Sequence, residues 1–347
     1  MNALYQSLNP AERSFIDQKK ISASYKIKRW IHFLSKASKF DIIIESETKK
    51  WNRLGVIFIL LAIASVVGIF VLPMNLNFII GIPLAVIFLA LTIFSFKKKG
   101  EFKSKDINDY LRKFFMPVLN ILKEKAGEDT KMAAALDFRI PRKELKPKTG
   151  KVGVRSYKSY HPNYIRSKVE LLDGATLEFS VADQISDFSW SKRSASGKTK
   201  YKSKTKVVHQ CLIKMTLPKS AYQVKEPIEN SVAVTEHNGD YIAKHKIKLK
   251  KIGVNNALNV SIFFKGVQAI YNQFESLNNL QARKPKENDA DDVEEYEDYD
   301  DGVDIMDVAA AYMWLDSDFD DYDYDSFDYA EGSDFSVDDD SATVFDS

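Results

Sequence analysis

The chain has a single cysteine, and one long part of it has no charge. Because Cys211 is the only cysteine among 347 residues, no disulfide can form within the chain, which fits a reducing compartment. Between Leu54 and Phe96 there is no Asp, Glu, Lys, Arg or His. This absence excludes a proton or ion pathway that uses ionisable side chains in that stretch, and it permits the stretch to lie in a bilayer.

The uncharged stretch, residues 54–96, divides into two apolar segments, 54–72 and 78–96. Each is close to the roughly 20 residues that a helix needs to cross a bilayer, and Pro73–Asn77 between them has the composition of a turn. Lysine and arginine flank the outer ends, namely Lys49, Lys50, Arg53, Lys97, Lys98 and Lys99, and the turn has none. The sequence therefore predicts a transmembrane helical hairpin, integral to the lipid bilayer of a bacterial inner (cell) membrane, with both termini in the cytoplasm.

Basic residues are absent from the last part of the chain. Residues 287–347 contain 25 acidic residues and no Lys or Arg, whereas residues 1–286 contain all 50 basic residues and 23 acidic ones. Such a block repels itself and has little apolar surface to bury, so we expect a disordered acidic tail. Its partner should be cationic, either the basic body of the same chain or another molecule.

The tail also contains one apolar segment, Val303–Leu315, among its acidic and aromatic residues. A short apolar segment of this kind can fold as a helix into the groove of a protein partner, whose identity the sequence does not give. The alternative is a tail that only increases solubility. The predicted partner-binding residues are Ile305, Met306, Val308, Tyr312, Met313, Trp314 and Leu315.

The N-terminal region, residues 1–53, begins with a capping pattern. Asn9, Pro10 and Glu12 predict a helix that starts near Pro10. Aromatic residues alternate with lysine and arginine after it, as in a basic amphipathic helix. Two placements stay open: the helical region lies at the lipid headgroups, or it packs against the cytoplasmic domain.

Residues 97–286 predict a cytoplasmic α+β domain. Apolar residues recur at helical spacing over 107–122 and again over 263–277, with a kink expected near Pro117. Asp173-Gly174 and Asn238-Gly239 each separate two strand-like segments and favour the primed turns of tight hairpins. The fold class is thus an α+β membrane protein, in which a two-helix transmembrane hairpin precedes an antiparallel-sheet domain with flanking helices.

Two predicted strands carry rows of lysine. Side chains alternate along a strand, so lysines two residues apart share one side. A row can be an ordinary solvated face, or it can bind anionic lipid headgroups, the chain's own acidic tail or nucleic acid. We disfavour nucleic acid because the rows have little aromatic interleaving apart from Tyr201. The candidate anion-binding residues are Lys192, Arg193, Lys198, Lys200, Lys202, Lys204, Lys206, Lys244, Lys246, Lys248 and Lys250.

The sequence shows no catalytic constellation, metal-ligand cluster or cofactor motif. His209 and Cys211 are two residues apart, but they share a strand face with apolar residues and are better explained as half-buried strand residues. We therefore predict a membrane-anchored, cytoplasm-facing protein that binds or scaffolds and does not catalyse. The alternatives are a membrane-tethered hydrolase-like enzyme, with His161 near Asp183 or Asp187, and a membrane-tethered nucleic-acid-binding protein.

Overall fold

A computed structural model of the chain describes residues 5–71, 81–194, 197–226, 231–251 and 258–277. The acidic tail and its Val303–Leu315 segment lie outside these residues, so their predictions stay untested. In chain order the elements are α2 Pro10–Gln18, β1 Lys20–Lys26, α3 Ile27–Val71, α5 Ile82–Lys105, η2 Leu111–Phe115, α6 Met116–Ala126, β2 Lys131–Asp137, α7 Pro141–Glu144, β3 Lys148–Val152, β4 Arg155–Tyr160, β5 Asn163–Glu170, β6 Thr176–Arg193, β7 Thr199–Pro218, β8 Tyr222–Val224, β9 Val232–His237, β10 Asp240–Lys251, α8 Val260–Tyr271 and β11 Phe274–Ser276.

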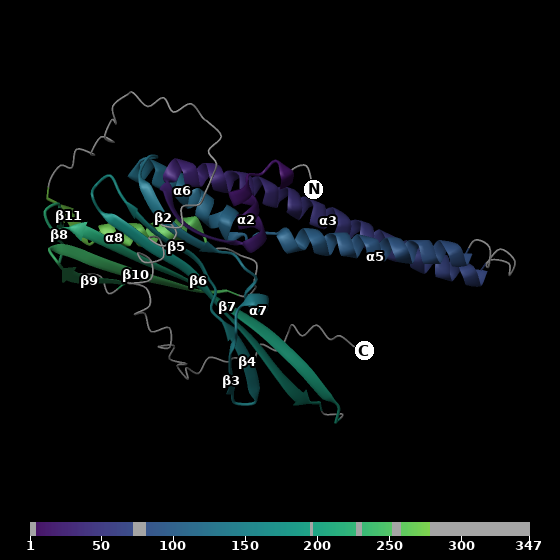
Figure 1. Cartoon of the computed structure of the whole chain (residues 1–347). Helices are drawn as coiled ribbons and strands as arrows, with labels where there is room; N and C mark the ends of the chain where they lie inside the picture. The colour runs from purple at the N-terminus through teal and green to yellow at the C-terminus, as the bar shows by residue number, and fades with distance from the viewer. Residues whose placement is uncertain (1–4, 72–80, 195–196, 227–230, 252–257, 278–347) are drawn as a thin grey trace.

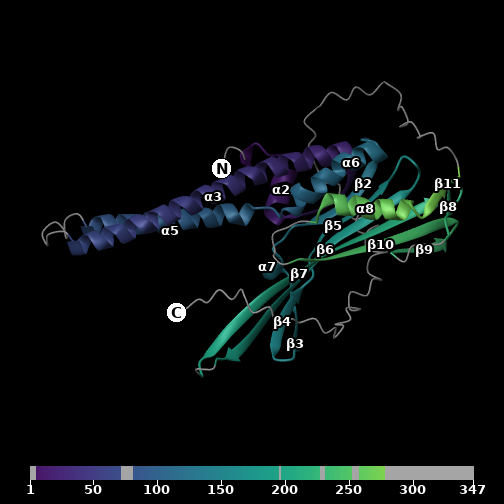
Figure 2. The ribbon, with the colours of Figure 1, turned by 180° about the vertical axis from the view of Figure 1, so that it is seen from behind.

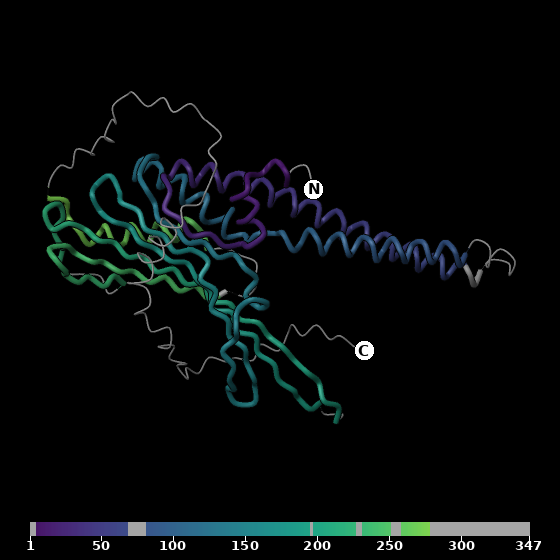
Figure 3. The backbone as a smooth tube through the Cα atoms, viewed as in Figure 1, coloured from purple at the N-terminus to yellow at the C-terminus, as the bar shows by residue number. Residues whose placement is uncertain are grey.

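The centre of the fold is an antiparallel sheet with strand order β1-β2-β5-β6-β7-β10-β9. The strands β6 and β7 are 18 and 20 residues long, and their outer halves extend beyond the main sheet, where β4 and then β3 pair alongside β6. Figure 3 shows this part of the chain projecting from the domain. The predicted α+β class with an antiparallel sheet is confirmed.

Both predicted hairpins are present, but the predicted primed turn forms only at Asn238-Gly239; at Asp173-Gly174 only the glycine has a positive φ, and the Gly174 amide donates to the Leu171 carbonyl oxygen. Gly174 has a φ of 81° between β5 and β6, and Asn238 and Gly239 have φ values of 49° and 85° between β9 and β10. Two successive positive φ values define the primed turn that an Asn-Gly pair favours, because asparagine and glycine adopt this region at low cost. Local sequence therefore sets the register of both hairpins.

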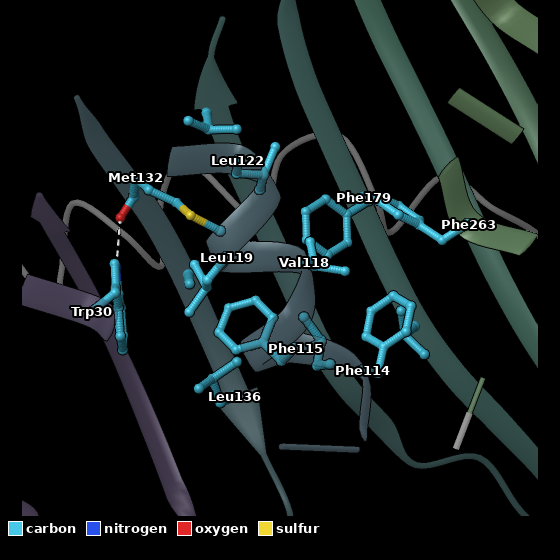
Figure 4. Close-up of a cluster of buried hydrophobic side chains, with 14 of the residues drawn as sticks. Trp30, Phe114, Phe115, Val118, Leu119, Leu122, Met132, Leu136, Phe179 and Phe263 are labelled. Atoms are coloured by element: carbon cyan, nitrogen blue, oxygen red, sulfur yellow. Dashed lines mark hydrogen bonds between the residues drawn. The ribbon is translucent and has the colours of Figure 1, made fainter. Parts of the chain in front are cut away.

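A layer of helices covers one face of the sheet (Figure 1), and the core lies between them. Phe263 of α8 contacts Phe179 of β6 and Phe114 of η2, with ring centroids 4.9 and 5.6 Å apart. Trp30, at the start of α3, is fully buried and donates its Nε1 hydrogen to the carbonyl oxygen of Met132 at 2.9 Å. Figure 4 shows these side chains in one continuous cluster.

The N-terminal region belongs to this core. The predicted capping box is present, since the Asn9 side chain accepts from the Glu12 amide and the Glu12 side chain accepts from the Asn9 amide. The helix ends at Gln18, and the φ of 56° at the next residue, Lys19, turns the chain into β1. This edge strand pairs with β2, and the sequence pattern did not predict it. Of the two placements considered for this region, the buried side chains of Trp30, Phe33 and Leu34 favour packing against the domain.

Two predicted helices differ in detail from the structure. The helix after the two apolar segments begins with one π-helical turn, η2, directly before α6, which contains Pro117 at its second position. The missing amide hydrogen of proline makes an irregular turn at this place inexpensive. The closing helix α8 ends at Tyr271, so Phe274 lies in the short strand β11, paired with β8, and not on the helix.

The helices α3 and α5 lie side by side and project away from the sheet domain (Figures 1 and 2). The rings of Trp51 and Phe94 are 5.8 Å apart, and Lys99 Nζ donates to Asn52 Oδ1 at 2.7 Å. Gly55 permits this approach, because a Cβ atom there would lie 3.2 Å from the Phe96 ring. The two helices are therefore direct neighbours at the end closest to the domain.

Among the described helices, one stretch, Ile27–Gly68 of α3, is long and apolar enough to cross a membrane. Apolar side chains are exposed on both projecting helices: Ile63 of α3 is 55% exposed and Ile87 of α5 is 53% exposed. The predicted turn Pro73–Asn77 lies outside the described residues. The structure thus supports one long apolar helix near the N-terminus, which is weak evidence for membrane association.

Candidate functional site

The two lysine rows lie on one face of the sheet. In the antiparallel register Lys244 pairs with Lys214 and Lys250 with Val208, so the lysines of β10 share a side with the even-numbered residues of β7. The odd-numbered residues face the helices, since the Ile213 side chain lies against Gly266 of α8. We name the opposite side the basic face; its predicted residues are Lys192, Lys200, Lys202, Lys204, Lys206, Lys244, Lys246, Lys248 and Lys250.

The other two predicted anion-binding residues lie at the turn between β6 and β7. Lys198 is exposed just before β7. Arg193 pairs with Thr199, which places it on the side opposite Lys192, and its Nε donates to the carbonyl oxygen of Gly197 at 3.2 Å. The register therefore excludes Arg193 from the basic face, although its charge remains next to that face, at the turn between β6 and β7.

Aromatic residues lie among the lysines of the basic face. Trp190 of β6 pairs with Lys202, and Phe188 pairs with Lys204. Tyr157 of β4 pairs with Phe188, and their ring centroids are 5.9 Å apart. The interpretation that the rows have little aromatic interleaving was wrong, because the aromatic residues come from neighbouring strands. Tyr201, which the sequence suggested, pairs with Ser191 on the other side.

The charges of the basic face are close enough to repel one another. Burial lowers the pKa of Lys206, and the neighbouring charges of Lys204, Arg155 and Lys250 lower this pKa further. Lys250 belongs to β10, so the two lysine rows interact electrostatically across the sheet. Burial and the charge of Lys248 lower the pKa of Lys246 in the same way. A bound anion would relieve this repulsion and favour the charged lysines.

A second group of polar side chains is buried on the helix side of the sheet. Asp183 Oδ1 accepts from the Tyr110 hydroxyl at 2.8 Å and lies 2.6 Å from His209 Nδ1. All three residues are buried, and the Tyr164 ring stacks on Tyr110 with centroids 4.7 Å apart. Burial and the Asp183 charge raise the pKa of Tyr110, so its hydroxyl stays protonated. Through these contacts Tyr110, the residue before η2, is held against Asp183 of β6 and His209 of β7.

The residues of the enzyme alternative have hydrogen-bond partners of their own. His161 Nε2 is 3.2 Å from Ser159 Oγ, and Asp183 contacts Tyr110 and His209. The Asp187 carboxylate accepts two hydrogen bonds from the Arg142 guanidinium, at 2.7 and 2.8 Å, and this contact lowers the pKa of Asp187.

The His209 and Cys211 strand face is buried as predicted, and burial raises the pKa of the Cys211 thiol, which opposes nucleophilic reactivity. Within the described ranges, no three His, Cys, Asp or Glu side chains gather where they could hold a metal ion. Comparisons of the chain with protein families, with curated proteins and with solved structures find no match.

We expect Tyr110→Phe to lower the free energy of unfolding by about 1 to 2 kcal/mol. The substitution removes one hydrogen bond to the buried Asp183 carboxyl and leaves that oxygen with one donor fewer. Tyr201→Phe is the matched control, because Tyr201 is 87% exposed. Urea unfolding followed by circular dichroism in a neutral detergent measures both variants. Equal stability of the two variants would show that the buried network does not stabilise the junction between η2 and the sheet.

Proposed function

We propose that this chain is a membrane-anchored, cytoplasm-facing binding and scaffold protein. The observation that carries the proposal is the joining of two different surfaces in one chain: two neighbouring helices with exposed apolar side chains, and a sheet with one strongly basic face. The apolar surface suits lipid, and the basic surface suits anions.

In this proposal α3 and α5 span the membrane as a hairpin over residues 54–72 and 78–96. The side-by-side contact of Trp51 with Phe94 supports the hairpin, and so does the clustering of lysine and arginine at the domain end of both helices. Exposed isoleucines such as Ile63 and Ile87 would then contact hydrocarbon and not water. The sheet domain and both termini lie in the cytoplasm.

The basic face binds polyanions in the cytoplasm. Mutual repulsion between Lys206, Lys204 and Lys250 is present without a ligand, so an anion gains more there than at an isolated lysine. Two polyanions are always near: the anionic lipid of the same membrane and the acidic tail of the same chain. The tail also recruits a protein partner through Val303–Leu315. When that partner binds, the tail would leave the basic face, and the lysines there would become available to lipid.

The test uses a chain that ends at residue 286, held in phosphatidylcholine nanodiscs, and a fluorescent peptide of residues 287–347. We expect the peptide to bind and its affinity to fall about tenfold or more as salt rises from about 0.05 M to about 0.5 M, because exposed charges are screened. A peptide of the same length with asparagine and glutamine in place of its acidic residues is the control. Absence of binding, or binding that salt does not weaken, would refute a polyanion-binding face.

A further inference from the structure

A part of the sheet stands apart from the helix layer and forms a projecting arm. We define the arm as β3, β4, residues 186–193 of β6 and residues 199–206 of β7. In both opposite views of the ribbon the arm leaves the domain on the same side as the paired helices α3 and α5 and slants away from them toward its tip (Figures 1 and 2). The arm and the helix pair therefore project from the same side of the domain.

The arm combines basic and aromatic side chains on one face. The register aligns Gly150, Tyr157, Phe188 and Lys204 in a single row across four strands. Gly150 lets the Tyr157 ring lie across β3, because a Cβ atom at that position would be 2.6 Å from the tyrosine oxygen. Lys206 Nζ lies 5.6 Å from the Phe188 ring centroid. These contacts hold the aromatic rings in place among the lysines.

A neighbouring cross-strand row of the arm repeats this combination. The Arg155 guanidinium lies 4.8 Å from the Trp190 ring centroid, next to Lys202. Apolar and aromatic side chains are exposed near the tips: Val154 is 85% exposed and Tyr201 is 87% exposed. Aromatic, aliphatic and basic side chains together are the composition that binds the headgroup region of a membrane, where rings and lysine stems enter the interface and charges meet phosphate.

We propose that the arm is a second membrane contact, which binds the anionic phospholipid headgroups of the bilayer that holds α3 and α5. This inference rests on the membrane anchor of the proposed function. The anchor keeps the arm at high local concentration near one bilayer surface, so weak individual contacts suffice. The same phosphate and aromatic chemistry would also suit single-stranded nucleic acid. The projection of arm and anchor from the same side of the domain favours the membrane. The lysine row of β10 stays available for the acidic tail.

The experiment places a nitroxide spin label near the tip of the arm in the full-length protein. The label is attached at Val154→Cys, in the exposed turn between β3 and β4, in a Cys211→Ala background. The protein is reconstituted into vesicles of phosphatidylcholine alone or with about 30% phosphatidylglycerol, a typical anionic content. Collisions of the label with a nickel chelate, present on both sides of the bilayer, measure exposure to water. A label at Ser220→Cys, exposed in the turn between β7 and β8, is the positional control.

We expect phosphatidylglycerol to lower the collision rate at Val154→Cys by about fivefold or more, because binding of the arm buries the label and each basic group near an anionic surface contributes about fivefold in affinity. The Ser220→Cys label should not change. Charge reversal on the arm by Lys200→Glu, Lys202→Glu and Lys204→Glu should abolish the protection. The matched reversal on β10 by Lys246→Glu, Lys248→Glu and Lys250→Glu should leave it intact.

Three results would overturn the inference: no protection by phosphatidylglycerol, equal effects of the two triple variants, or protection by a single-stranded DNA of about 20 nucleotides but not by anionic lipid. The same vesicles also separate this inference from the proposed function. If the protein resists extraction by alkaline carbonate while the label stays exposed, the anchor stands and only the arm contact fails.

Discussion

Aspartate at both Ile63 and Ile87 is expected to release the protein from the membrane. The two residues lie at the centres of the predicted spans 54–72 and 78–96, and both side chains are exposed. An aspartate at the centre of a membrane helix costs about 2.5 to 3.5 kcal/mol for insertion, so two of them cost about twice as much. If water surrounded these helices, the same substitutions would be nearly neutral or would increase solubility.

Carbonate extraction of membranes from cells that express each variant measures this effect. The unmodified chain should stay in the membrane pellet, and Ile63→Asp with Ile87→Asp should appear in the soluble or aggregated fraction. Ile42→Asp is the matched control, because Ile42 lies on α3 before the predicted span and is 52% exposed. A double variant that remains in the pellet as the control does would refute a hydrocarbon environment for the helix pair.

The second large effect concerns Trp30. We expect Trp30→Ala to lower the free energy of unfolding by about 3 to 5 kcal/mol, because the ring is fully buried and its removal leaves a large cavity. The substitution also removes the hydrogen bond to the Met132 carbonyl, which links α3 to β2. A loss of this size would establish that residues before the apolar segment 54–72 are part of the sheet domain.

Urea titration followed by far-ultraviolet circular dichroism in a neutral detergent gives the value for Trp30→Ala. Tyr201→Ala is the control, since it removes an aromatic ring that is almost fully exposed on the arm. If Trp30→Ala were no more destabilising than this control, the N-terminal region would not contribute to the stability of the sheet.

Local patterns in the sequence predicted the features that depend on neighbouring residues. The Asn9 to Glu12 capping box, the turns at Gly174 and Asn238-Gly239, and the one-sided lysines of β7 and β10 each follow from residues within a few positions of one another. The chemistry that sets them is local: a side chain that caps an amide, a positive φ, and the alternation of a strand.

Features that depend on distant pairing were not visible in the sequence. The edge strand β1 has weak alternation and exists because it pairs with β2, more than 100 residues later in the chain. The basic face gains its aromatic character from the β6 register, which brings Trp190 beside Lys202 and Phe188 beside Lys204. The Asp183, His209 and Tyr110 contacts join three separate segments in the same way. Register over long separations is set by the whole core, so single-sequence patterns do not contain it.

The central claim is that a two-helix membrane anchor holds the sheet domain in the cytoplasm, and cysteine labelling of intact cells tests it most directly. In a Cys211→Ala background, Asn75→Cys and Lys103→Cys are each treated with a maleimide that does not cross membranes. The proposed hairpin predicts that Asn75→Cys reacts in intact cells and that Lys103→Cys reacts only after the membrane is permeabilised. Reaction of Lys103→Cys in intact cells, or protection of both cysteines until permeabilisation, would contradict it.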